Sequence, residues 1–285
     1  MREKVTVPSI LARKGGPRIR MVTAYDGPSA RIADRAEADI ILVGDSLGTV
    51  ILEYENTLPV TVDTIVYHSA AVTRTKPQAL VVGDMPWLSF HLSAEETVRN
   101  AGRLIREGGV SAVKLEGGRK RLPMIEALLA AEIPVMGHLG LTPQSFHSMG
   151  GFKVQGKKAD AARELLADAH ALANAGVFSI ILEGIPDVLA QMITREVQVP
   201  TIGIGAGPHC DGQVLVFHDV LGFHDARMAK FVRQYARLFD TATEALQHFF
   251  ADVQSGEYPS AAESYHMNET EAESLSLYAQ RDDHR

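Results

Sequence analysis

Short apolar runs that alternate with stretches of helical spacing constrain the fold of this 285-residue chain more than any other feature. Several runs, such as DIILVG, ALVVGD and FSIILE, are apolar almost throughout, which is typical of parallel strands covered on both faces. Eight such runs occur, at residues 20–25, 40–44, 80–84, 112–116, 135–139, 179–183, 201–205 and 214–219. The alternation predicts parallel βα units, and eight units predict an α/β fold, the (β/α)8 barrel.

The segments between the runs have the periodicity of amphipathic helices. The sequence SAEE at residues 93–96 has the form of a capping box, and apolar stripes recur over 162–173 and 186–196. The longest helical pattern extends from about residue 226 to 253. Beyond it the chain becomes polar, so we expect a single catalytic barrel domain over 1–260 and a flexible tail over 261–285.

Composition excludes several classes of protein. The chain has 35 acidic and 28 basic residues and a net charge of −7, which argues against nucleic-acid binding, because phosphate neutralisation needs clustered Lys and Arg. Its single cysteine, Cys210, cannot form an internal disulfide, so a reducing compartment, the cytoplasm, is expected. No signal-peptide core and no run long enough to span a bilayer is evident, so no membrane association is expected.

Polar residues stand at the ends of several predicted strands. In a barrel, the carboxyl ends of the strands form the face that carries the active site. One such carboxylate alone is more often a helix cap or a solvated loop residue, but such residues at the same end of five different strands are harder to explain in that way. The residues are Asp45, Ser46, Asp84, Lys114, Glu116, His138 and Glu183.

Asp45, Asp84 and Glu116 follow neighbouring strands, so their carboxylates could converge on one Mg²⁺, which prefers oxygen ligands. Without a cation, three adjacent acids would repel one another. The alternative is that Lys114 and nearby arginines neutralise the acids as a structural ion-pair network, and spacing alone leaves both interpretations open.

Glu183 follows the apolar run FSIIL, and burial there would favour its neutral form, the tuning that a general base needs. It could equally cap the helix that starts near Pro186. His138 could line the same pocket or be a satisfied core histidine. The glycine-rich run at 203–208 lacks the spacing of a nucleotide-binding loop and suits a tight turn. Cys210 has no catalytic partner and is expected to be buried and inert.

Many strings of the chain resemble those of the ketopantoate hydroxymethyltransferase family, over roughly residues 5–250. They include TAYDGPSA, ILVGDSLGTV, AVKLEGG, PVMGHLGLTPQS, GFKVQGK, ILEGIP and PTIGIGAGPHCDGQVLVFHDVLG. The resemblance implies a barrel of the phosphoenolpyruvate mutase/isocitrate lyase type. It also implies transfer of a one-carbon unit from 5,10-methylenetetrahydrofolate to 3-methyl-2-oxobutanoate, giving 2-dehydropantoate on the route to pantothenate and coenzyme A.

The resemblance also implies roles for individual residues. Asp45, Asp84 and Glu116 match the family's magnesium site, and Glu183 matches its proton acceptor. The keto-acid contacts fall on Asp45, Ser46, Asp84, Lys114 and His138. In this mechanism the cation stabilises an enolate-like transition state, and the residues around 203–207 and 150–158 are candidate walls for the folate.

A lyase and a catalytically silent barrel are the two other functions that a barrel of this type could have. A lyase of the same barrel type would use a Lys-Lys-Cys-Gly-His segment, whereas the only cysteine here lies in PHCDGQ. A catalytically silent barrel is disfavoured by the intact acids at the strand ends. Relatives form large rings, so a homo-oligomer, with a decamer favoured, is expected from the resemblance, and the aromatic-rich last helix is a candidate contact surface.

Overall fold

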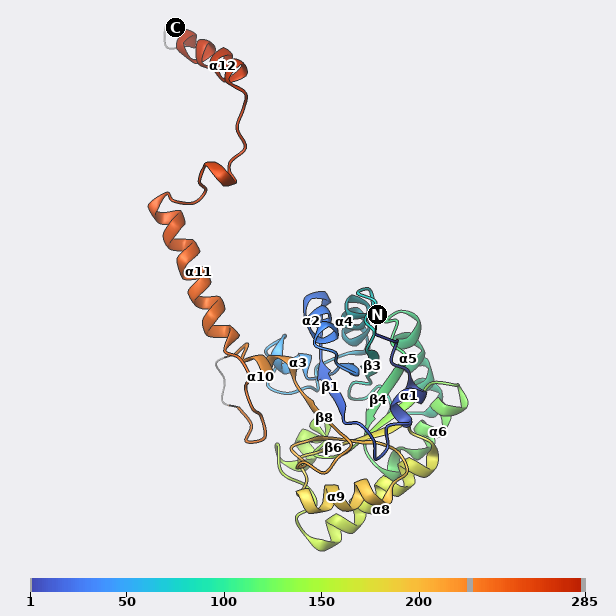
Figure 1. Ribbon diagram of the computed structural model, residues 1–285. Helices are drawn as coiled ribbons and strands as arrows, with labels where there is room; N and C mark the ends of the chain where they lie inside the picture. Colours follow the sequence, from blue (N-terminus) through green and yellow to red (C-terminus); the bar gives the residue numbers. More distant parts are fainter. Residues whose placement is uncertain (1, 225–227, 283–285) are drawn as a thin grey trace. The chain divides into compact units, whose positions relative to one another are not determined.

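The computed structural model describes residues 2–224 and 228–282, within which eight parallel strands close into a barrel in chain order (Figure 1). The strands are β1 (Ile19–Thr23), β2 (Ile40–Val43), β3 (Leu80–Asp84), β4 (Ala112–Glu116), β5 (Val135–Gly140), β6 (Ser179–Glu183), β7 (Thr201–Ile204) and β8 (Gly212–Leu215). The predicted (β/α)8 barrel is confirmed, and β3, β4 and β6 have the predicted bounds.

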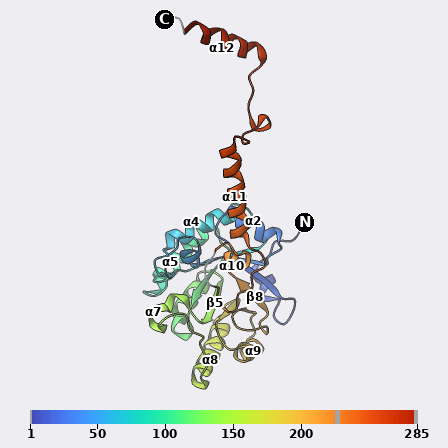
Figure 2. The ribbon, with the colours of Figure 1, turned by 90° about the vertical axis from the view of Figure 1, so that its left-hand side faces the viewer.

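One short helix comes before β1, and the other helices and short helical turns follow strands around the outside of the barrel (Figures 1 and 2). They are α1 (Val7–Leu11), α2 (Gly27–Arg35), α3 (Leu47–Val50), α4 (Val62–Thr73), α5 (Ala94–Arg106), η1 (Arg119–Arg121), α6 (Leu122–Ala130), η2 (Pro143–Ser145), α7 (Phe146–Met149), α8 (Ala159–Ala175), α9 (Asp187–Glu196) and α10 (Phe217–Leu221). The predicted Ser93 cap is present, since its side chain accepts a hydrogen bond from the backbone N–H of Glu96 at the start of α5.

Alternate residues of the strands pack on opposite sides of the sheet. Ile40 and Leu42 lie in the cluster that fills the barrel, whereas Ile41 and Val43 pack outward against the helices. Both faces of the inner strands are therefore buried, which explains why their sequences are apolar throughout. Val5 belongs to the interior cluster, and its backbone N–H donates to Gln78 O just before β3, so the N-terminal segment lies at the amino ends of the strands.

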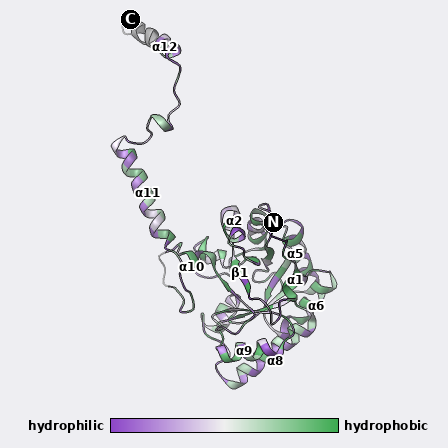
Figure 3. Ribbon diagram, viewed as in Figure 1, coloured by the Kyte–Doolittle hydropathy of each residue, from purple (hydrophilic) through white to green (hydrophobic). Residues whose placement is uncertain are grey.

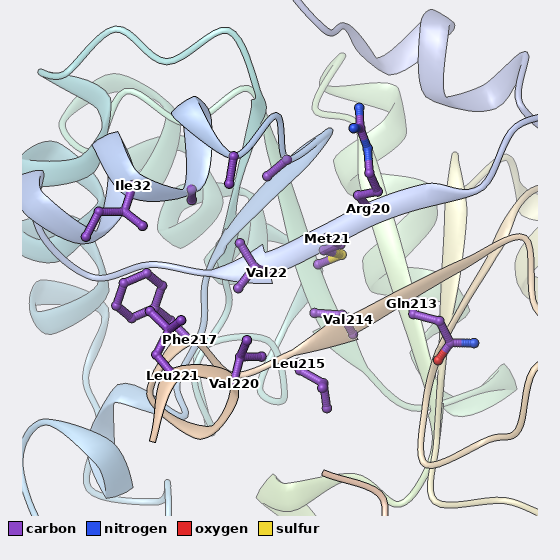
Figure 4. Close-up of a pocket in the computed structure, with 13 residues that line it drawn as sticks. Arg20, Met21, Val22, Ile32, Gln213, Val214, Leu215, Phe217, Val220 and Leu221 are labelled. Atoms are coloured by element: carbon purple, nitrogen blue, oxygen red, sulfur yellow. The ribbon is translucent and has the colours of Figure 1, made fainter. Parts of the chain in front are cut away.

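The outer face of β1 and β8 is an exception. Burial alternates along these two strands, and Arg20 and Gln213 are exposed where the other strands are covered. A groove of about 310 Å³ lies there, lined by Val22, Ile32, Phe217 and Leu221 among others (Figure 4). Arg20 is the single ionisable side chain among the described residues that line it, so this groove lacks the groups that catalysis by acids and bases requires.

Two predicted elements need correction. The eighth strand is Gly212–Leu215 and not 214–219, because Gly212 and Gln213 pair with β1, and the backbone N–H of Phe217 donates to Thr23 Oγ1 at the start of α10. The helix predicted over 226–253 begins only at Leu238; residues 226 and 227 lie outside the described residues. Contacts with the barrel override the periodicity of 228–237, since Tyr235 N donates to Val220 O and Phe231 packs on Gly205.

The chain divides into two compact units, Met1–Ala236 and Arg237–Arg285. The second contains α11 (Leu238–Ser255), η3 (Ala261–Glu263) and α12 (Glu269–Asp282). The segment after residue 260 thus has more helix than its polar sequence indicated, and a capping box between Ser260 and Glu263 starts η3. The division at 260 between catalytic domain and tail stays a prediction.

Helix α11 carries both apolar and polar residues along its length (Figure 3). Its large apolar side chains are exposed and, at 100° per residue, fall on one face; they are Phe239, Leu246, Phe249, Phe250 and Val253. No helix within the described residues is long and apolar enough to cross a membrane.

Candidate active site

The carboxyl ends of the strands bring all seven predicted site residues to one small pocket, with a cavity of about 110 Å³. The strand register explains the convergence, because Asp84 pairs with Lys114 and Glu116 pairs with His138 across adjacent strands. The pocket is lined by Thr23, Leu42, Asp45, Ser46, Asp84, Lys114, Glu116, His138, Pro143, Ile181, Glu183, Ile204, Val214, Leu215 and Val216. Charged side chains therefore line one part of this small cavity, and apolar side chains line the rest.

Lys114 lies among the acids. Its side chain is 4% exposed, and Nζ lies 2.8 Å from Asp84 Oδ1 and 3.6 Å from Glu116 Oε1. Although burial alone would lower the pKa of Lys114, the charges of Asp84 and Glu116 raise it, so the side chain is cationic. The ion-pair network that the sequence left open is therefore present, and it involves Lys114.

His138 links the acids of β4 and β6. Its Nδ1 lies 3.3 Å from Glu116 Oε1, and its Nε2 lies 3.2 Å from Glu183 Oε2. Burial and the charge of Lys114 would lower the pKa of His138, but contacts with Glu116 and Glu183 outweigh them and raise it to about 9. Glu183 faces His138, and α9 begins at Asp187, after the N-cap residue Pro186, without a side-chain cap, so the capping alternative for Glu183 is wrong.

Carboxyl groups outnumber cationic side chains in the pocket. Burial raises the pKa of Asp45 well above its ordinary value, and the charges of Asp84 and Glu116 raise it further. Burial also raises the pKa of Asp84, against the lowering effect of Lys114. Although burial would raise the pKa of Glu116 too, the charge of Lys114 and the contact with His138 hold it below its ordinary value. Two cationic side chains thus face four carboxyl groups, counting Glu183.

The donor set suits a hard divalent cation. Asp84 Oδ1 and Glu116 Oε1 are buried and receive no hydrogen bond of good geometry from the described residues. Within the same residues, no three His, Cys, Asp or Glu side chains form a ready-made metal cage. Mg²⁺ does not require one, because it is commonly bound by one or two carboxylates with substrate oxygens and water. The residues present therefore fit Mg²⁺ in a site that the substrate completes.

Two residues of the site were missed from the sequence. Gln144 is buried, and its Nε2 donates to Asp45 Oδ2 at 2.9 Å. The Tyr25 hydroxyl is hydrogen-bonded to Ser46 Oγ at 2.8 Å, and burial raises the pKa of Tyr25, so this hydroxyl is neutral. Tyr25, in TAYDGPSA, ends the predicted strand 20–25 but was not among the polar residues singled out at strand ends, and Gln144, in LTPQS, lies beyond the end of the predicted strand 135–139.

The glycine-rich run at 203–208 and Cys210 have the structures that the sequence predicted, a tight turn and a buried free cysteine. Gly205 and Gly207 have φ of +61° and +77° in the turn after β7, where side chains of Phe231 and Asp187 approach closely. The glycines thus serve a tight turn. Cys210 is free and buried.

Solved structures share this barrel. One is a 2,3-dimethylmalate lyase of the phosphoenolpyruvate mutase/isocitrate lyase superfamily, with a TM-score of 0.57, 16% identity and 99% of each chain covered. Another is phosphonopyruvate hydrolase in complex with oxalate and Mg²⁺, with a TM-score of 0.58, 12% identity and coverage of 97% of this chain and 96% of that one. At these identities the likeness defines the class of fold, a (β/α)8 barrel of the phosphoenolpyruvate mutase/isocitrate lyase type.

Sequence comparison identifies the family within this class. The family model of ketopantoate hydroxymethyltransferase matches residues 4–261. Relatives named 3-methyl-2-oxobutanoate hydroxymethyltransferase include one from Pelobacter propionicus, 53% identical over 266 residues, and one from Moorella thermoacetica, 54% identical over 265 residues. Each alignment covers 93% of this chain and 98% of the relative. The chain belongs to the ketopantoate hydroxymethyltransferase family and is an enzyme of that family.

Proposed function

We propose that this enzyme transfers a hydroxymethyl unit from 5,10-methylenetetrahydrofolate to 3-methyl-2-oxobutanoate, giving 2-dehydropantoate in pantothenate and coenzyme A biosynthesis. Family membership supports the type of transfer. The observation that carries the proposal is the pocket itself, in which Glu183, His138 and Lys114 meet the acids of β2, β3 and β4.

The pocket suits a small branched keto acid. Ile181, Ile204 and Val214 supply apolar surface for the branched alkyl group. Lys114 supplies positive charge on the opposite side, where the carboxylate or the keto oxygen of the substrate would lie, and Ser46 adds a hydroxyl group. We propose Asp45, Ser46, Asp84, Lys114 and His138 as the residues that contact the substrate.

We infer that Asp45, Asp84 and Glu116 hold Mg²⁺ together with oxygens of the keto acid. When bound, the cation supplies Lewis-acid stabilisation of the negative charge that develops on the keto oxygen. The excess of carboxyl groups in the pocket supports this inference, because a dication would relieve the repulsion that raises the pKa of Asp45 and of Asp84.

Glu183 is the proposed base. It takes the proton from C3 of the substrate, and the electron pair of the broken C–H bond leaves negative charge on the keto oxygen. C3 then forms a C–C bond with the one-carbon unit as the keto carbonyl re-forms. The bonds from this carbon to the folate nitrogens break, water supplies the hydroxyl group, and tetrahydrofolate leaves after its nitrogens take up the proton removed from C3 and the second proton of the water. Proton removal by a positioned base typically contributes ~10² to 10⁴ in rate. His138, 3.2 Å from Glu183, orients the carboxylate.

Deuterium exchange at C3 tests the base directly. With Mg²⁺ and the keto acid in D₂O, Glu183→Gln should lower the exchange rate by about 10² or more while the keto acid still binds. The control is Glu196→Gln, because Glu196 also pairs with a histidine, His170, but on the surface. Undiminished exchange in Glu183→Gln would remove Glu183 as the base.

The complete reaction needs the folate. We propose that it lies against the glycine turn at 203–207 and the segment 150–158, which follow β7 and β5 at the same end of the barrel. An assay with both substrates and Mg²⁺ should yield 2-dehydropantoate. Absence of product with all components present would contradict the proposed function.

We further propose a cytoplasmic homo-oligomer, with a decamer favoured by the family resemblance. The exposed apolar face of α11 supports association, and the unpaired cysteine is compatible with a reducing compartment. Light scattering tests the assembly, and fractionation of cells tests the location.

A further inference from the structure

Gln144 lies after β5 and forms hydrogen bonds with groups at the carboxyl ends of β2, β3 and β4. It lies in η2 after β5, and its Nε2 donates to Asp45 Oδ2 and to Met85 O, each at 2.9 Å. Its backbone N–H donates to Glu116 Oε2 at 3.1 Å. One residue therefore contacts an acid after β2, the backbone after β3 and an acid at the end of β4.

The orientation of the Gln144 amide follows from its partners. Both groups near Nε2 are acceptors, a carboxylate and a carbonyl, so this atom must be the amide nitrogen. Oε1 is consequently fixed, and it is buried without a donor among the described residues. A buried acceptor without a donor costs free energy, which partly offsets the two hydrogen bonds that Nε2 donates.

The contacts of Gln144 and of the Asp45 backbone N–H occupy one oxygen of each of the three acids. Gln144 engages Asp45 Oδ2 and Glu116 Oε2, and the backbone N–H of Asp45 engages Asp84 Oδ2 at 3.0 Å. Glu116 Oε1 receives no hydrogen bond of good geometry, and Asp84 Oδ1 faces Lys114. Each carboxylate is thus held on one side by Gln144 or by the backbone N–H of Asp45, while the second oxygens of Asp84 and Glu116 face the cationic side chains of Lys114 and His138.

We propose that Gln144 is a positioning residue of the cation site, which holds one oxygen each of Asp45 and Glu116 and thereby orients these carboxylates so that their second oxygens can bind a divalent cation. The inference rests on the proposed function, because it concerns the same site. Partners of this kind, which hold a ligand without touching the metal, typically change metal affinity 10- to 100-fold when they are removed.

Mn²⁺ binding to the full-length protein, followed by electron paramagnetic resonance with the keto acid present, tests the proposal without turnover. Gln144→Met preserves the length of the side chain and removes the Nε2 donor to Asp45, while the backbone N–H that donates to Glu116 remains. We expect its dissociation constant for Mn²⁺ to rise about 10- to 100-fold. The control is Gln198→Met, an exposed glutamine between α9 and β7, which should leave the constant unchanged.

An unchanged Mn²⁺ affinity in folded Gln144→Met would overturn the role of Gln144. Circular dichroism checks the fold; if Gln144→Met does not fold, Gln144→Asn, whose shorter amide cannot reach both acceptors, takes its place under the same criterion. If the unsubstituted protein binds no Mn²⁺ with the keto acid present, the proposed function itself fails, and this inference fails with it.

Discussion

Two buried aspartates at opposite ends of the strands are held by different partners. Asp84, at the carboxyl end of β3, faces Lys114 and two other acids. Asp39, just before β2, is surrounded by the guanidinium groups of Arg2, Arg13 and Arg20 at 3.0–3.2 Å. The pKa of Asp84 is raised and that of Asp39 is lowered. The raised pKa of Asp84 shows that its anion is destabilised, which a bound cation would relieve. The lowered pKa of Asp39 shows that its anion is stabilised by the arginines, so its ion pairs stabilise the fold.

Asp84→Asn should weaken magnesium-dependent binding of the keto acid, because the variant loses a charged oxygen ligand. We expect the affinity to fall at least about 10-fold, measured by calorimetry with and without Mg²⁺. Asp63→Asn, which removes an exposed acid paired with Arg103, is the matched control. Equal affinity for Asp84→Asn and the unsubstituted protein would count against a cation at this position.

Asp39 should make the stability of the barrel depend on pH. Although burial would raise its pKa, hydrogen bonds from Arg20 lower it below the ordinary 3.8. Its contribution to stability is therefore complete above about pH 4 and is lost as the pH falls through the lower, folded-state pKa. Asp39→Asn should cost about 2 kcal/mol at pH 7 and flatten the loss of stability below pH 4.

Urea unfolding at pH 7 and at pH 3 measures this difference. Asp160→Asn is a suitable control, since Asp160 is exposed and pairs with Arg163 on the surface of α8. An Asp39→Asn variant that loses stability below pH 4 as steeply as the parent protein would show that Asp39 is not the group responsible.

At the scale of elements, the periodicity of apolar residues predicted the strands, whose positions depend on local sequence. The inner strands are apolar on both faces, so their positions were predicted to within a residue or two, and the acids after them were predicted to converge. Residues 228–236 have helical spacing, but Phe231 and Tyr235 among them contact the barrel, and no local pattern reports such a contact. Gln144 was missed for the same reason, because its partners come from three distant segments.

The junction of β5 and β6 shows how an element positions the proposed base. Gly140 has φ of +98°, and a Cβ atom there would lie 2.2 Å from the carbonyl oxygen of Glu183. The same carbonyl accepts a hydrogen bond from Leu141 N. Only glycine permits this close approach of the two backbones.

Gly140→Ala should therefore destabilise the protein by about 3 kcal/mol and lower C3 exchange, since the clash displaces Glu183. Gly151→Ala is the matched control: Gly151 has φ of +104° but no atom within 4 Å of an added Cβ, so it should cost only about 1 kcal/mol of backbone strain. Equal costs for the two variants in urea unfolding would show that the contact with Glu183 is unimportant.

At the scale of the whole molecule, the second unit carries an unusual amount of exposed apolar surface. The exposed fractions of Leu246 and Phe250 on α11 are 54% and 59%, and they share a face with three other large apolar side chains. A contiguous apolar face of this kind indicates association with another protein surface. Association between copies of the chain is the form that we propose.

A charge on this face should disrupt the assembly and spare the barrel. Leu246→Glu places a carboxylate in the apolar stripe, and its desolvation would oppose association, so the mass measured by light scattering should fall. Gln247→Glu adds the same charge to the polar face of α11 and should leave the mass unchanged.

The proton exchange of the keto acid, which requires only the barrel pocket, should persist in Leu246→Glu, because every residue that lines this pocket lies before residue 217. A mass that does not change in Leu246→Glu would show that α11 is not the contact surface, and loss of exchange together with loss of mass would show that assembly supports the site.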